Sequence, residues 1–418
     1  MKKIAIASGF FLITVLVSFV ANAQAGKAKG IQVMAAPVDA KLVLPAGFSS
    51  TIVADGVAGA RHIAVSRQGG IYIKLAWLNE GKGIVYLKDT NHDGLFDQQQ
   101  LFGNYPGTGI CIRDNYLYAS SNDDVYRYAL DKNGEVLHPD QPEKIITGLV
   151  NHDRDNSKSI TTDGKGHIYV NVGSYSNSCL LDPNSKKAPN PCPLLDSVGG
   201  IWQFNTAKLN QHQGDGVHYA TGFKNVVGLD WNSQVNALYI MEHNRGQLHE
   251  LYPEYYTEEQ GDLTAAETMY KVTKGSTGGW PYVYYDHFQH KQILSPEYGG
   301  DGKKTATKKY QDPTMAFPAH LAPNGLLFYT GNQFPAKYKN GAFIAFHGRS
   351  AQLKKGYLVA FVPMKNGQPS GPWEIFADNI MLEKELHKPC GLAQGPDGSL
   401  YVTDDTNGRI YKISYKKG

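Results

Sequence analysis

Residues 159–170 contain the pattern that decides the fold: Ser159-Ile160-Thr161, a polar turn, and then His167-Ile168-Tyr169-Val170. A short segment of small and apolar residues is followed, after the turn, by a segment rich in aromatic and β-branched residues. Such residues favour strands, and the aspartate and glycines between them favour a tight connection. This stretch therefore predicts two neighbouring strands of a small sheet.

The same pattern recurs along the chain in six units. Most units lead into a further strand, as at 200–204, and their inner strands are expected near 61–65, 109–113, 158–162, 226–230, 324–328 and 390–394. One four-stranded sheet cannot bury both faces, but a closed ring of such sheets can. The repeats predict an all-β fold, a six-bladed β-propeller of four-stranded antiparallel sheets with loop insertions. Two separate all-β domains are the alternative.

The two ends of the chain are expected to close this ring. Residues 49–56 resemble residues 374–379, a segment that precedes a unit. The strand near 49–54 should therefore become the outermost strand of the last blade, beside residues 410–414. Insertions are expected at 179–192 and at roughly 252–317.

The N-terminal residues indicate export. Lys2 and Lys3 precede an uncharged apolar run at 4–20, and Ala21-Asn22-Ala23 follows it. This pattern predicts a signal peptide at 1–23, a linker at 24–45 and a single propeller domain at 46–418, in the periplasm or secreted. A membrane anchor is the alternative, although the run is short for a span of about 20 residues.

Composition excludes some partners. The 418-residue chain has a formal net charge of +3, and removal of the two leader lysines leaves +1. Lysine and arginine are scattered, so no nucleic-acid or membrane-surface patch is expected. No segment after the leader is apolar enough to span a membrane.

The four cysteines fit an oxidising compartment. Cys179 and Cys192 flank a polar, proline-rich loop, and a disulfide between them would hold a loop that has no core of its own. Two free thiols are the alternative. Cys111 and Cys390 begin similar strands in distant units and are expected to be small buried residues.

Residues 89–97 resemble a calcium-binding loop, with candidate oxygen ligands from Asp89, Asn91, Asp93 and Asp97 and with Gly94 at the sharp turn. The distal glutamate of a full EF-hand is missing, since Gln100 occupies that position. We expect a structural calcium ion here, and a polar turn without an ion is the alternative.

Polar segments gather where the inner strands are expected to begin, around a central channel. They contribute His152 and Asp155, Lys224 and Asn225, Lys388, Arg245 and His320. For any single residue, a polar strand end bonded to backbone or water is the simpler interpretation. Together these cations and amides could hold an anionic planar ligand, with an acid or a histidine as base.

Several of these segments also carry a family resemblance that covers most of the chain after the leader. The chain resembles the soluble quinoprotein sugar dehydrogenases, specifically the sorbosone dehydrogenase-like branch. The resemblance rests on 168–179, 191–195, on Tyr219-Ala220-Thr221-Gly222-Phe223-Lys224-Asn225, on Gly279-Trp280-Pro281-Tyr282, on 317–320 and on 392–398.

The resemblance implies a propeller that binds pyrroloquinoline quinone (PQQ) and calcium over the channel and oxidises a sugar hydroxyl. In the family a histidine in the third blade accepts the hydroxyl proton, while an Arg-Asn pair in the fourth blade and an arginine in the sixth bind the quinone carboxylates. Here the histidine position is Asp155, with His152 three residues earlier, and the arginine positions are Lys224 and Lys388. Lysine keeps the charge but lacks the bidentate fork of arginine.

The resemblance therefore implies a periplasmic, PQQ-dependent oxidoreductase acting on a sugar or a sugar-derived alcohol or aldehyde. Its electrons would pass to a separate acceptor, since no haem-attachment motif is present. A propeller that has lost the cofactor and binds a carbohydrate or protein partner is the second hypothesis. A calcium-dependent lactonase-type hydrolase on the same fold is the third.

Overall fold

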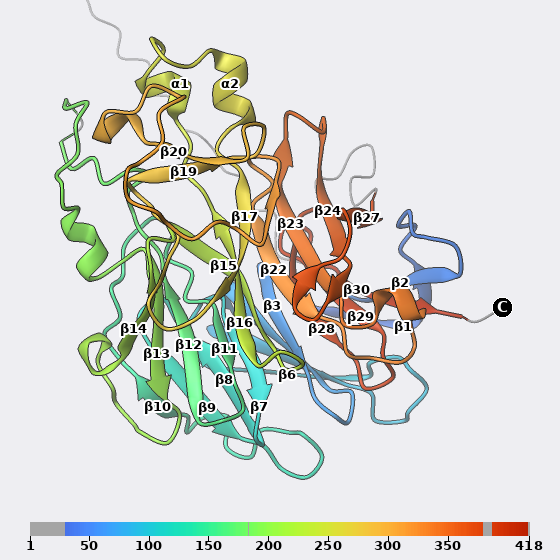
Figure 1. Ribbon diagram of the computed structural model, residues 1–418. Coiled ribbons are helices and arrows are strands. Elements are labelled where there is room, and N and C mark those ends of the chain that lie inside the picture. The colour runs from blue at the N-terminus through green and yellow to red at the C-terminus, as the bar shows by residue number, and fades with distance from the viewer. Residues whose placement is uncertain (1–29, 183, 379–386, 417–418) are drawn as a thin grey trace, which may run out of the picture.

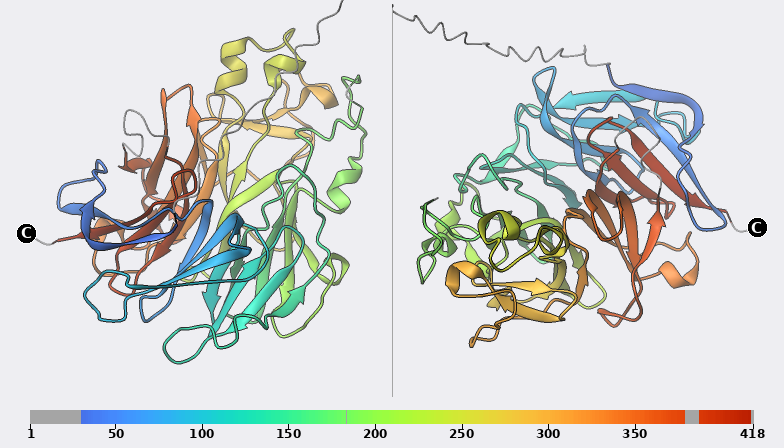
Figure 2. Two further views of the ribbon diagram at one scale, coloured as in Figure 1. Left: turned by 180° about the vertical axis from the view of Figure 1, so that it is seen from behind. Right: turned by 90° about the horizontal axis from the view of Figure 1, so that it is seen from above.

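The computed structural model describes residues 30–182, 184–378 and 387–416. The predicted signal peptide and linker residues 24–29 lie outside these described residues. Six antiparallel sheets stand around a central axis (Figures 1 and 2), which confirms the six-bladed β-propeller. The six inner strands contact one another in a closed cycle, in the order β3, β7, β11, β15, β22, β28 and back to β3.

Blades 1 to 3 follow one another along the chain, each running from its inner strand outward. Blade 1 contains β3 (Ala60–Val65), β4 (Ile71–Asn79), β5 (Lys82–Lys88) and β6 (Gln98–Phe102). Blade 2 contains β7 (Ile110–Arg113), β8 (Tyr116–Ser120), β9 (Val125–Ala129) and β10 (Glu143–Ile146). Blade 3 contains β11 (Ile160–Thr162), β12 (His167–Val172), β13 (Gly200–Asn205) and β14 (Val217–Thr221), with β18 (Ser276–Thr277) added in parallel to β14.

Blades 4 to 6 complete the ring. Blade 4 contains β15 (Asn225–Asn232), β16 (Ala237–His243), β17 (Glu267–Val272) and β21 (Met315–Phe317). Blade 5 contains β22 (Pro323–Phe328), β23 (Ala342–Ser350), β24 (Lys355–Val362) and β27 (Glu374–Ala377). Blade 6 contains β28 (Pro389–Gln394), β29 (Leu400–Asp404), β30 (Ile410–Tyr415), β2 (Phe48–Asp55) and β1 (Gln32–Asp39).

The hydrophobic core lies between neighbouring blades, because each sheet is apolar on both faces. Between blades 4 and 5, for example, the rings of Tyr239 and Phe328 meet with their centroids 4.8 Å apart, and both side chains are buried.

Strand β2 closes the ring by pairing with β30, as predicted from the sequence. Phe48 of β2 also packs against Phe334 and Phe376 of blade 5, with ring centroids 4.8 and 5.0 Å away. Residues 32–39, which we expected in a linker, instead form β1 on the outside of β2. The exposed edge of β2 offers unpaired backbone groups to the preceding chain, and Pro37 is tolerated because β1 is an edge strand.

The two insertions pack on blades 3 and 4. Cys179 and Cys192 form the predicted disulfide, and Cys111 and Cys390 are free. The second insertion contains helices α1 (Leu248–Leu251) and α2 (Glu258–Leu263) and the hairpin β19 (Val283–Asp286) and β20 (Lys291–Leu294), which lie above blade 4 in Figure 1. A smaller hairpin, β25 (Met364–Lys365) and β26 (Gln368–Pro369), projects from blade 5. Among the described residues, no helix has the length and apolarity needed to cross a membrane.

Candidate functional site

All six inner strands begin at the same face of the ring, so the residues around these starts surround the central channel. We call this opening the mouth, and define it by Arg61, Thr108, Lys158, Lys224, Asn324 and Lys388 with their direct contacts. Below the mouth, a cavity of about 360 Å³ follows the axis between the inner strands and reaches Arg113 and Asp230. Burial raises the pKa of Asp230 to about 6.

Besides Lys388, the mouth brings three of the residues predicted from the sequence into direct contact. The ammonium group of Lys224 donates to Asp155 Oδ2 at 2.6 Å, and Asn225 Nδ2 lies 3.3 Å from Asp155 Oδ1. Both oxygens of this carboxylate are therefore engaged by its neighbours. Asn225 is itself held by Asn171, whose amide donates to Asn225 Oδ1 at 3.1 Å.

Two buried carboxyl groups lie behind Lys224. Glu242 Oε1 accepts the backbone N–H of Lys224 at 2.9 Å, and Glu267 accepts the backbone N–H of Asn244 at 3.2 Å. Burial raises the pKa of Glu242 to about 7 and that of Glu267 to about 8. Beside them, burial lowers the pKa of His243 to about 4, and the charges of Asp155, Lys224 and His347 all act on this ring.

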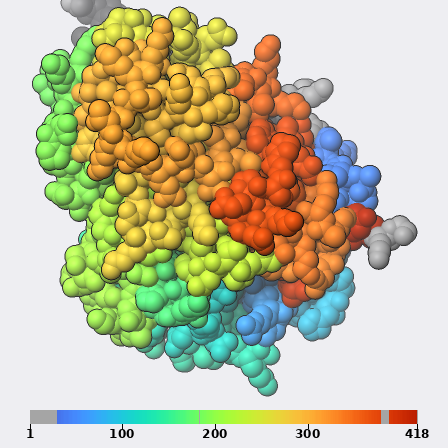
Figure 3. Space-filling view, viewed as in Figure 1, coloured from blue at the N-terminus to red at the C-terminus, as the bar shows by residue number. Residues whose placement is uncertain are grey.

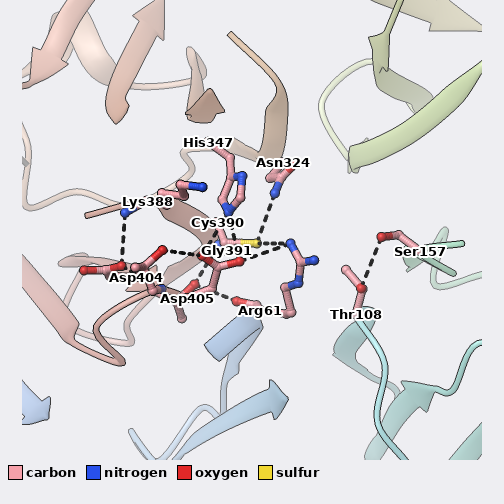
Figure 4. A network of polar contacts seen from close by, with 12 residues as sticks. Arg61, Thr108, Ser157, Asn324, His347, Lys388, Cys390, Gly391, Asp404 and Asp405 are labelled. Carbon is pink, nitrogen blue, oxygen red and sulfur yellow. Dashed lines mark hydrogen bonds and ion pairs between the residues drawn. The ribbon is translucent and has the colours of Figure 1, made fainter. Parts of the chain in front are cut away.

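A second cluster occupies the opposite part of the mouth (Figure 4). Arg61 Nη1 lies 3.2 Å from Asp405 Oδ2, and His347 Nε2 lies 2.9 Å from both oxygens of Asp405. Arg61 Nη1 and Asn324 Nδ2 also approach the sulfur of Cys390, at 3.8 and 3.5 Å. Burial raises the pKa of the Cys390 thiol to about 11, so it stays a neutral thiol at ordinary pH.

Lys388 and Lys158 complete the positive charge of the mouth. The backbone N–H of Lys388 donates to Asp404, while its ammonium group forms no ion pair with any described carboxylate. Lys158 is buried, its ammonium group donates to Asn156 Oδ1 at 2.7 Å, and burial lowers its pKa to about 7.

Three predicted site residues have other surroundings. Arg245 is buried in a bidentate ion pair with Glu297 of the second insertion, at 2.6 and 3.0 Å, so its guanidinium is engaged there and not available to a ligand of the mouth. His320 is exposed, with Nε2 3.5 Å from the carbonyl oxygen of Gly261. His152 is exposed and packs on the ring of Tyr175, with centroids 3.9 Å apart.

The predicted calcium loop lies far from the mouth, at the face where the inner strands end. Asp89 follows β5, whose last residues pair with the start of β4 at that face. The loop is closed by its own hydrogen bonds: Gly94 N–H donates to Asp89, Leu95 N–H to Asp93, and Thr90 to Asp97. In the described parts of the chain, no group of three or more His, Cys, Asp or Glu side chains is placed to hold a metal ion.

Sequence reasoning missed Arg61, His347 and Asp405. A signal for them exists: Glu242 and His243 end the second strand of blade 4, His347 lies in the second strand of blade 5, and Asp405 directly follows that of blade 6. Antiparallel pairing brings these strand ends beside the starts of the inner strands, so in blades 4 to 6 residues of both the first and the second strand lie at the mouth.

Comparison with known proteins extends this picture. A pyrroloquinoline quinone-dependent sugar dehydrogenase of Hypocrea jecorina is 21% identical over 401 residues, 88% of each chain. An uncharacterized protein of Borreliella burgdorferi is 25% identical over 405 residues, 93% of this chain and 94% of its own.

Solved structures share the fold. A calcium structure of a family AA12 carbohydrate-active enzyme from Trichoderma reesei superposes with a TM-score of 0.72 at 18% identity, covering 92% of this chain and 98% of its own. The PQQ domain of a pyranose dehydrogenase from Coprinopsis cinerea, in its holo form, gives a TM-score of 0.69 at 18% identity, covering 90% and 97%. The TrAA12-like family matches residues 42–416, almost the whole propeller, and the chain therefore belongs to this family.

Proposed function

We propose that this propeller is a quinoprotein oxidoreductase that oxidises a sugar or a sugar-derived alcohol or aldehyde, with PQQ bound at the mouth. The relatives support the class, since the Hypocrea jecorina protein is named a PQQ-dependent sugar dehydrogenase. A sorbosone-like substrate, export to the periplasm and a separate electron acceptor belong to the same proposal.

The observation that carries this proposal is the set of unsatisfied donors at the mouth. Arg61 Nε is buried without a hydrogen-bond partner among the described residues, and the Lys388 ammonium, 5.9 Å from the centroid of the Tyr357 ring, lacks an ion-pair partner there. A buried donor without a partner costs about 1–3 kcal/mol, so a ligand that accepts hydrogen bonds from these groups would stabilise the mouth. A planar molecule with several carboxylates and carbonyl oxygens, such as PQQ, fits this set of donors.

Different residues of the chain would bind the quinone and accept the substrate proton. Lys224, Asn225 and Lys388 would hold carboxylates of the quinone, as point charges and an amide instead of the arginine forks of the family. PQQ would supply hydride acceptance, and the protein would supply orientation and a proton acceptor. Asp155 and His152 are the acceptors that the sequence proposes.

Calcium is proposed in a structural role at residues 89–97. Asp89 Oδ1 is buried without a hydrogen-bond partner among the described residues, which leaves one carboxylate oxygen for a cation. The position of this loop, on the face away from the mouth, separates its ion from the chemistry.

The test is quinone uptake by the purified, cofactor-free protein in calcium buffer, followed by absorbance and then by a dye-linked oxidation screen over sugars. We expect saturable uptake at micromolar quinone, and weaker uptake by Lys388→Ala. Lys291→Ala, on the exposed hairpin, is the matched control and should bind like the wild type. An absence of uptake by the wild type would reject the dehydrogenase function.

A cofactor-free propeller that binds a carbohydrate or protein is the second candidate. The ion pair between Lys224 and Asp155 favours it, because Lys224 is already neutralised at the position where the family holds a quinone carboxylate. This function predicts saccharide or protein binding that added quinone neither enhances nor prevents.

A further inference from the structure

His347 and Asp405 form a histidine–carboxylate pair at the mouth that joins three blades. His347 comes from β23 in blade 5, Asp405 follows β29 in blade 6, and Arg61 of β3 in blade 1 contacts the same carboxylate at 3.2 Å. Figure 4 shows Asp405 between the imidazole and the guanidinium. Burial acts to raise the pKa of Asp405, but the hydrogen bond from His347 and the charge of Arg61 hold that pKa below its ordinary value.

This arrangement fixes the tautomer of the neutral imidazole. Asp405 is an anion, so it accepts hydrogen bonds and His347 Nε2 must carry the proton that it donates. The lone pair is then on Nδ1, which points away from Asp405 and has no hydrogen-bond partner among the described residues. The side chain of His347 is 20% exposed, so this lone pair can be reached from the mouth.

Asp155 and the other histidines around the mouth are less suited to accept a proton. Asp155 uses both oxygens on Lys224 and Asn225, and His152 packs on Tyr175 outside the network. His62 Nε2 bonds to the carbonyl oxygen of Asn324 at 2.9 Å. Burial lowers the pKa values of His62 and His243 to about 4, well below the neutral range in which a general base is most effective.

We propose that His347, positioned by Asp405, is the proton acceptor for the oxidation of the substrate hydroxyl. This inference rests on the proposed function. The O–H proton of the alcohol passes to Nδ1 of His347 while the C–H bond breaks, the hydride leaves to the quinone acceptor, and the substrate becomes a carbonyl compound. Asp405 stabilises the imidazolium that forms, as the orienting carboxylate does in other histidine bases.

The charges around His347 act on the imidazolium that forms. Asp405 favours this cation, whereas Arg61 and Lys388 oppose it, and the Cys390 thiol is neutral. Removal of the Asp405 charge therefore leaves only the opposing cations, and it should destabilise the imidazolium.

The experiment compares His347→Gln, His347→Ala and Asp405→Asn with the wild type and with His138→Gln, an exposed histidine outside the mouth. Quinone uptake is measured first and should stay within roughly threefold of the wild type in the two His347 variants and in His138→Gln. With saturating quinone, His347→Gln should lower kcat by roughly 100-fold or more, which is the rate enhancement that a general base typically contributes. The KM should change little. Imidazole in the buffer should restore part of the turnover of His347→Ala.

Asp405→Asn provides a readout that does not depend on turnover. Nitrogen NMR of labelled histidine in the cofactor-free protein should show Nε2–H on neutral His347 in the wild type, and a weaker preference for this tautomer in Asp405→Asn. The kcat of Asp405→Asn with saturating quinone should fall as well. A role in folding alone would leave the tautomer preference unchanged.

The outcomes separate the two proposals. If the variants take up quinone and His347→Gln turns over within twofold of the wild type, His347 is not the base, and the dehydrogenase function stands. If the wild type takes up no quinone, the proposed function fails and this inference fails with it.

Discussion

Lys224 contacts two different carboxyl groups at the mouth, one through its ammonium group and one through its backbone N–H. Its ammonium bonds to Asp155, and its backbone N–H bonds to the buried Glu242. A ligand carboxylate at Lys224 has to compete with Asp155 for the same cation. The affinity of the mouth for anions therefore depends on this pair as well as on the other cations around it.

Opposite effects are expected when the two members of this pair are changed. Lys224→Ala removes a charged donor and should weaken quinone uptake by roughly tenfold to 100-fold. Asp155→Asn frees Lys224 and should strengthen uptake by roughly tenfold. Absorbance titration of each purified variant measures both constants, and a weaker uptake by Asp155→Asn would show that the carboxylate helps to hold the ligand.

Glu267 should make stability depend on pH. Its pKa is raised in the folded protein to about 8 from an ordinary 4.5, so the folded state binds its proton more tightly than the unfolded state does. The stability contributed by this group is complete below pH 4.5 and is lost as the pH rises through about 8. Within that window the loss is about 1.4 kcal/mol per pH unit at most.

Glu267→Gln keeps the shape of the side chain and cannot ionise. The variant should gain stability over the wild type as the pH rises from 5 to 8, measured by urea unfolding at each pH. Parallel profiles for the two proteins would mean that Glu267 ionises normally in the folded state.

At the scale of single elements, the turn at 89–97 can be compared with a second turn in the same protein. Asp131 accepts the backbone N–H groups of Asn133 and Glu135 in the turn that follows blade 2's third strand. Both turns use aspartate to cap backbone donors, but only the first has a buried, unpartnered carboxylate oxygen, at Asp89, among the described residues.

Calcium should therefore stabilise the protein through the first turn alone. In calcium, Asp93→Ala should lose the stabilisation that the ion supplies to the wild type, about 2.7 kcal/mol when calcium is 100 times its Kd. In a chelator the loss should be limited to the two hydrogen bonds of this side chain. Asp131→Ala is the control, with equal losses in both buffers; equal losses for Asp93→Ala would identify 89–97 as a plain turn.

At the scale of the whole molecule, stability depends on closing the ring between its ends. Strand β2 supplies the fourth strand of blade 6, and Phe48 inserts among aromatic rings of blade 5. Strand β1 only covers the edge of β2, and most of its residues are exposed. The space-filling view shows the C-terminal residues packed beside these N-terminal strands (Figure 3).

Two truncations test this closure. A chain that begins at residue 58 lacks β1 and β2, exposes the edge of β30 and should lose cooperative thermal unfolding or aggregate. A chain that begins at residue 40 lacks only β1, and its Tm should fall by no more than about 4 °C. If the chain that starts at residue 58 is soluble and unfolds cooperatively, then five complete blades and the three remaining strands of blade 6 are enough for a stable fold.

The sequence alone determined the inner strands, the closure through residues 49–54 and the bond between Cys179 and Cys192. These features follow from local signals, because strand patterns repeat in each unit and a proline-rich loop between two cysteines is short. The likeness of residue 155 and of Lys224, Asn225 and Lys388 to family positions directed attention to the mouth, and their role in binding a quinone stays a prediction.

Only the tertiary structure decided which charges meet. Arg245 is taken by Glu297, Lys224 by Asp155, and Arg61 lies beside Cys390, 329 residues away in the sequence. Ring closure brings such distant residues together, and the pairing depends on side-chain direction and burial, which a strand pattern does not encode. For the same physical reason, the His347–Asp405 pair became visible only once the strand ends of three blades stood around one axis.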